Sequence, residues 1–96
     1  MSEDAELVAR LLLALAEPGD EVGFDRLRPA FYRRARDGGG DAEQRFTAAL
    51  AEWERAGALA RWLNPRDHSI YAGFDRSRLA ARLAPPGPLS RPSALA

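Results

Sequence analysis

Apolar residues near the start of the chain recur at intervals of three and four, which predicts an amphipathic helix over Glu3–Glu17. Ser2 is placed to cap this helix, and the acidic residues of its first turn suit the positive end of the helix dipole. Pro18-Gly19-Asp20 is typical of a turn and ends the helix. The apolar stripe consists of Leu7, Val8, Leu11, Leu12 and Leu15.

A short extended segment and a second helix follow. Glu21–Phe24 places its two apolar side chains on one face by alternation, as a strand does. Asp25 is a favourable N-cap for a helix over Arg26–Arg36, and Pro29 is tolerated in the first turns of that helix. The inward-facing residues of this second helix are expected to be Leu27, Phe31 and Ala35.

Three consecutive glycines, residues 38–40, separate the second helix from a third. Asp41 is expected to cap this third helix, which the pattern predicts over Ala42–Ala56. Gly57 is a natural residue just beyond its C-terminal end, because glycine adopts a positive φ without strain. The apolar stripe of the third helix consists of Phe46, Ala49, Leu50 and Trp53.

After Gly57 the spacing of apolar residues changes from helical to alternating. Ala58–Leu63 and His68–Phe74 alternate on either side of the polar turn Asn64–Asp67, which predicts a β-hairpin. Asp75 is placed to cap a short final helix over Arg76–Leu83. Residues 84–96 are rich in proline and serine, so we expect a flexible tail after one domain of residues 1–83.

The composition narrows the class of protein. The 96 residues suffice for one domain with a modest core. The chain has no cysteine, which excludes disulfides, thiolate chemistry and cysteine-ligated zinc. The acidic start lacks the features of a signal peptide, and the longest apolar run, Leu11–Ala16, is too short to span a membrane. These features favour a cytoplasmic protein.

The net charge is zero, but the charges are distributed in blocks. Residues 1–25 carry seven acids and one arginine, whereas residues 26–36 carry five arginines and no acid. Residues 37–54 carry five acids and one arginine, and residues 55–96 carry seven arginines and two acids. A neutral total argues against indiscriminate binding of polyanions, while the blocks leave room for a local basic face.

The predicted order of helix, strand, helix, helix and hairpin resembles the winged-helix variant of the helix-turn-helix domain. The most telling stretch is Phe46–Leu59, in which a helix with a regular apolar stripe leads through Gly57 and Leu59 into the hairpin. The resemblance covers Leu7–Phe74. It implies an α+β, mainly helical fold, in which three helices form the domain and the hairpin is the wing.

The resemblance also implies a function, because the third helix of DNA-binding winged-helix domains enters the major groove. The chain would then be a transcriptional regulator or an architectural factor that contacts double-stranded DNA as a homodimer. The implied DNA-binding residues are Arg26, Arg28, Arg33, Arg34 and Arg36 on the second helix, Gln44, Arg45, Thr47, Ala48 and Arg55 on the third, and Arg66 in the wing. The alternative for the second-helix arginines is a solvated face that balances neighbouring acids through salt bridges.

A second hypothesis is a protein-interaction module that does not bind nucleic acid. The segment Asp41–Arg55 holds four acids against two arginines, and an acidic helix is repelled by phosphates. The docking surface would be this acidic helix or the hairpin face that bears Trp62 and Tyr71, since Trp62 lies on the face opposite Leu59. The alternative for Trp62 is packing beneath the final helix.

Catalytic and metal-binding functions lack the residues that they need. His68 is the only histidine, so it has no second histidine or cysteine with which to hold a metal or arrange a nucleophile. The acid pairs Asp41/Glu43 and Glu52/Glu54 are two residues apart on a helix and face different sides. We therefore predict a binding module that is not an enzyme and uses neither a cofactor nor a metal.

Overall fold

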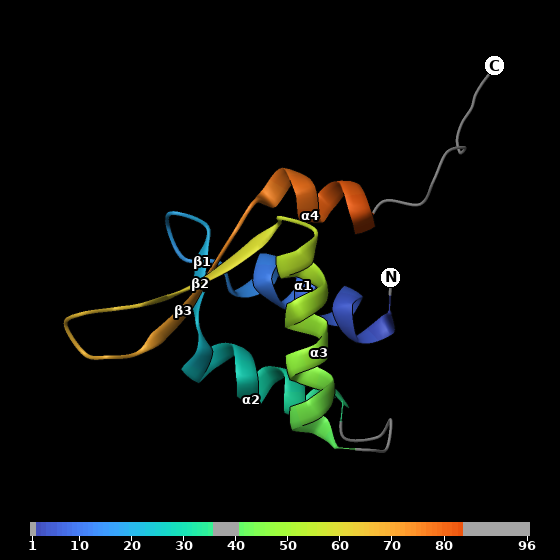
Figure 1. Ribbon diagram of the computed structural model, residues 1–96, viewed down its shortest axis with the longest axis horizontal. Helices are drawn as coiled ribbons and strands as arrows, with labels where there is room; N and C mark the ends of the chain where they lie inside the picture. Colours follow the sequence, from blue (N-terminus) through green and yellow to red (C-terminus); the bar gives the residue numbers. More distant parts are fainter. Residues whose placement is uncertain (1, 36–40, 84–96) are drawn as a thin grey trace.

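The computed structural model describes residues 2–35 and 41–83, and over these residues the chain forms a mostly helical α+β fold (Figure 1). The predicted fold class is confirmed at this level. Arg36, the glycine triplet and the proposed tail lie outside the described residues. In chain order the elements are α1 (Glu3–Leu15), β1 (Glu21–Gly23), α2 (Phe24–Ala35), α3 (Ala42–Arg55), β2 (Leu59–Leu63), β3 (Ile70–Phe74) and α4 (Arg76–Leu83).

Side-chain caps fix the starts of α1 and α3 where the sequence predicts them. The Ser2 hydroxyl accepts a hydrogen bond from the Ala5 N–H at 3.1 Å, and the Asp41 carboxylate accepts one from the Glu43 N–H at 3.0 Å. These bonds satisfy backbone donors that the first turn of a helix otherwise leaves free. Gly57 follows α3 with a φ of +74°, a backbone conformation that favours glycine.

Two predicted boundaries in the first half of the chain are wrong. Phe24 begins α2 instead of ending the strand, so Asp25 lies inside the helix and is not its cap. Starting the helix at Phe24 buries this ring edge-on against Phe46, with centroids 5.9 Å apart. Helix α1 also ends earlier than predicted, because Glu17 forms an antiparallel bridge with Glu21 instead of continuing the helix.

The three strands form an antiparallel sheet with the order β1-β3-β2. Strand β3 is therefore central, and the short β1 pairs with it across a sequence separation of about fifty residues. The β2–β3 hairpin extends away from the helices, to the left in Figure 1. The two ends of the hairpin therefore differ in burial, since the end nearest the helices is buried and the end nearest the turn is not.

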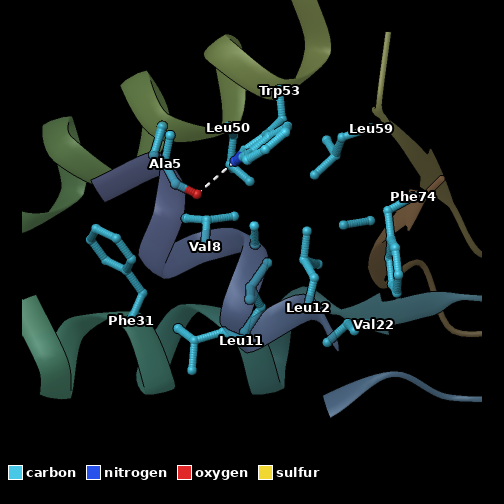
Figure 2. Close-up of a cluster of buried hydrophobic side chains, with 14 of the residues drawn as sticks. Ala5, Val8, Leu11, Leu12, Val22, Phe31, Leu50, Trp53, Leu59 and Phe74 are labelled. Atoms are coloured by element: carbon cyan, nitrogen blue, oxygen red, sulfur yellow. Dashed lines mark hydrogen bonds between the residues drawn. The ribbon is translucent and has the colours of Figure 1, made fainter. Parts of the chain in front are cut away.

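The core lies between α1, α2 and α3 and under the near end of the sheet. Trp53 of α3 is fully buried, and its indole N–H donates to the Ala5 carbonyl of α1 at 2.6 Å (Figure 2). Phe31 of α2 and Leu12 of α1 are also fully buried. Within residues 2–35 and 41–83 no helix is long and apolar enough to cross a membrane.

The predicted inward face of the hairpin is only partly buried. Leu59 and Phe74 are in the core as expected, but Leu63 is 56% exposed and Ile70 is 44% exposed. These two residues pair across the strands near the turn. Alternation correctly predicts their face but not their burial, because the hairpin reaches beyond the helices that cover that face.

Candidate functional site

The solvent-facing stripe of α3 is mostly small and neutral. Gln44, Thr47, Ala48 and Arg55 are exposed, and their spacing places them along one side of the helix. With the start of α1, this stripe borders a shallow groove of about 760 Å³. The groove is lined in part by Ser2, which the sequence suggested only as a cap. The groove is also lined by charged residues, among them Asp41, Glu43 and Glu52.

Arg45 is directed toward α1 and α2. Its guanidinium donates to the two carboxylate oxygens of Asp4 at 2.7 and 3.0 Å and to the Ala35 carbonyl at 2.8 Å. The Arg45 side chain is only 26% exposed. The hydrogen bond from Arg45 holds the pKa of Asp4 below its ordinary value. Arg45 therefore joins three helices, and its guanidinium is already engaged inside the protein.

The two acids in the second half of α3 are also engaged within the protein. Glu52 accepts hydrogen bonds from the hydroxyl and the backbone N–H of Ser2, and the hydroxyl bond lowers the pKa of Glu52. Glu54 accepts two hydrogen bonds from Arg61 of β2, at 2.8 and 2.9 Å. The charge of Glu54 is thus compensated by Arg61, whereas Glu52 is held by a neutral hydroxyl and keeps its charge.

The arginines of α2 point in several directions. Arg26 lies 3.9 Å from the Glu17 carboxylate, and Arg28 lies over the Phe46 ring at 5.7 Å from the centroid. Arg33 and Arg34 are exposed, and over the described residues neither is within ion-pair distance of a carboxylate. Two of the described α2 arginines therefore make contacts within the protein, and the other two are exposed without an ion pair.

The hairpin turn presents two further polar side chains to solvent. Arg66 and His68 are both exposed, and His68 has a φ of +61°. The turn is held by its own side chains, since Asn64 accepts from the Arg66 N–H at 2.9 Å and Asp67 accepts from the Ser69 hydroxyl at 2.6 Å. The Arg66 guanidinium is left at the tip of the hairpin.

Trp62 and Tyr71 form a stacked pair on the hairpin. Their ring centroids are 4.9 Å apart with an interplanar angle of 21°. Trp62 is 39% exposed, so the alternative of packing beneath α4 is wrong. The pairing of β1 with β3 brings Glu21 to the same face. Sequence alternation within the hairpin does not reveal this acid, because β1 is distant in the chain.

Comparison with known proteins does not assign a function to these surfaces. Comparisons with protein-family models, curated proteins and solved structures found no match. Among the described residues, no group of three or more histidine, cysteine, aspartate and glutamate side chains is placed to hold a metal ion.

Proposed function

We propose that this chain is a winged-helix protein that binds double-stranded DNA, with α3 in the major groove and the β2–β3 hairpin as the wing. The element order and the β1-β3-β2 sheet support the winged-helix assignment. In this arrangement the exposed stripe of α3 meets base edges, and Arg66 reaches the backbone from the hairpin tip.

The observation that carries the proposal is the set of exposed arginines on α2 and α3. Glu54 is paired with Arg61, which compensates its charge, whereas Glu52 is held by the Ser2 hydroxyl and keeps its negative charge. Arg33 and Arg34 of α2 and Arg55 of α3 are exposed and available for phosphate. In this arrangement α3 meets DNA with a polar stripe that includes Arg55, and α2 adds the guanidinium groups of Arg33 and Arg34.

The test is a titration of the chain against a fluorescently labelled random duplex, followed by anisotropy at several salt concentrations. We expect binding at low salt that weakens steeply as salt increases, because each neutralised phosphate releases counterions. The double variant Arg33→Ala with Arg34→Ala is expected to bind more weakly and to reduce the slope of log K against log salt by about two.

The matched control is the double variant Arg78→Ala with Arg82→Ala, which removes the same charge from α4. It is expected to leave the salt slope nearly unchanged. Absence of duplex binding at low salt would rule out the proposed function. An equal loss of slope in both double variants would show that only the total charge matters and that α2 is not the contact.

The second candidate is a protein-interaction module that does not bind nucleic acid. The observation that favours it is the exposed Trp62, stacked on the half-buried Tyr71, since aromatic side chains are enriched at protein interfaces. The duplex titration separates the two candidates, because this one gives no anisotropy change at any salt concentration.

A further inference from the structure

The outer face of the sheet bears the stacked Trp62–Tyr71 pair, of which Trp62 is exposed and Tyr71 is half-buried. The strand pairing places Gly23 and Gly73 beside the Trp62–Tyr71 pair on this face. A Cβ at Gly73 would lie 3.8 Å from the Trp62 indole, and a Cβ at Gly23 would lie 3.6 Å from the Tyr71 ring. The rings therefore pack against bare backbone. We call this surface the aromatic face: Glu21, Gly23, Ala60, Trp62, Tyr71 and Gly73.

Carboxylates surround the aromatic face. Glu17, Asp67, Asp25 and Glu21 act with burial to raise the pKa of Tyr71, and Glu17 contributes most. The Asp25 carboxylate lies over Gly23, because one of its oxygens is 2.6 Å from the position of a Cβ there.

Little positive charge offsets these acids. The nearest cation to Glu17 is Arg26 at 3.9 Å, and over residues 2–35 and 41–83 no ion pair involves Glu21, Asp25 or Asp67. The surroundings of the aromatic face are therefore electronegative, which disfavours phosphate and favours a cation.

We propose that the aromatic face is a docking site for an arginine-containing peptide segment of a partner protein. A guanidinium group is planar and weakly hydrated, so it stacks on an aromatic ring while its N–H groups donate to carboxylates. The exposed ring of Trp62, stacked on the half-buried Tyr71, supplies the stacking surface. Glu21 and Asp25, at the edge of the pair, supply the acceptors.

This site goes beyond DNA binding and does not depend on it. The proposed DNA contacts lie on α2, α3 and the hairpin tip, and none of their residues belongs to the aromatic face. A chain that fails to bind duplex can still bind the peptide, and the reverse also holds. The two proposals are therefore tested by separate ligands.

The experiment uses the full chain and a labelled peptide, Ser-Gly-Arg-Gly-Arg-Gly-Ser, with a second peptide that carries citrulline in place of both arginines. Anisotropy measures binding, and ¹H–¹⁵N spectra follow the indole N–H signals of Trp53 and Trp62. We expect the arginine peptide to bind and to shift the Trp62 signal. The Trp53 signal should not move, because that N–H is buried and bound to the Ala5 carbonyl.

Variants separate stacking from charge. Trp62→Ala is expected to weaken binding about fivefold or more, and Glu21→Gln about twofold to fivefold. The control for Trp62 is Leu63→Ala, a neighbouring exposed apolar residue whose side chain points to the other face of the sheet. The control for Glu21 is Glu43→Gln on α3, which changes the net charge by the same amount. Both controls are expected to bind as the natural chain does.

Several outcomes would overturn the proposal. Equal binding of the citrulline peptide would show that the guanidinium is not recognised, and an unmoved Trp62 signal would place the peptide elsewhere. If duplex DNA displaces the peptide and shifts the Trp62 signal, the face belongs to nucleic acid. If the Trp62 signal shifts with protein concentration alone, the occupant is a second copy of the chain. If Trp62→Ala loses the native Trp53 signal, that variant is not folded and its binding cannot be used. The peptide affinities of Glu21→Gln and Glu43→Gln are then compared, and equal affinities would overturn the proposal.

Discussion

At the scale of single residues, one buried hydrogen bond joins α1 and α3 inside the core. Trp53 is fully buried, and the Ala5 carbonyl that accepts its indole N–H lies 48 positions away in the chain. The bond satisfies a donor that would otherwise be stranded in the core. The apolar stripe of α3 predicts that Trp53 is inside, but no local pattern identifies the carbonyl, because that partner is set by tertiary packing.

Trp53→Phe is expected to lower the free energy of unfolding by about 2–3 kcal/mol. The substitution leaves a cavity and removes the hydrogen bond from the indole N–H to the Ala5 carbonyl. Urea denaturation followed by circular dichroism measures the change. Trp62→Phe is the control, because Trp62 is 39% exposed, and it should cost less than about 1 kcal/mol. Equal losses in the two variants would contradict the role of the buried bond.

At the scale of elements, local signals in the sequence predict the helices better than the sheet. The caps at Ser2 and Asp41 and the glycine after α3 are properties of a few neighbouring residues, and the structure has them where predicted. The start of α2 and the pairing of β1 with β3 depend on contacts with Phe46 and Tyr71, which are distant in the chain. For the same reason, the sequence does not predict that Glu21 lies beside Trp62 and Tyr71.

Arg45 shows how an element can direct one side chain inward while its neighbours face solvent. Arg45→Met is expected to lower the free energy of unfolding by about 1–2 kcal/mol, because it leaves the Asp4 carboxylate and the Ala35 carbonyl without their donor. Arg55→Met, on the exposed stripe, should change it by less than about 0.5 kcal/mol. Thermal and urea unfolding of both variants measures the difference. A larger effect for Arg55 would be inconsistent with the joining role of Arg45.

At the scale of the whole molecule, the alternating charge blocks of the sequence are connected by ion pairs between blocks. Asp4 pairs with Arg45, and Asp20 pairs with Arg76, each joining segments more than forty positions apart. Block composition suggests that acids and arginines attract one another, but it does not identify which of them meet. The unpaired remainder, free arginines on α2 and free acids beside the aromatic face, is what supports two separate binding surfaces.

These connections make stability depend on acid pH. The folded state holds the pKa of Asp4 and of Glu52 below the ordinary values of 3.8 and 4.5. The contribution of these carboxylates is therefore complete above about pH 5 and is lost as the pH falls through the folded-state values. We expect the free energy of unfolding to decrease over that range.

In the double variant Asp4→Asn with Glu52→Gln the decrease should be shallower, because two groups that bind protons on unfolding are gone. The control is Glu43→Gln, which removes an exposed acid from α3. Its free energy of unfolding should depend on pH as steeply as that of the natural chain. Denaturant titrations from pH 7 to about pH 3 give the slopes, and parallel curves for all three proteins would show that neither Asp4 nor Glu52 stabilises the fold through its charge.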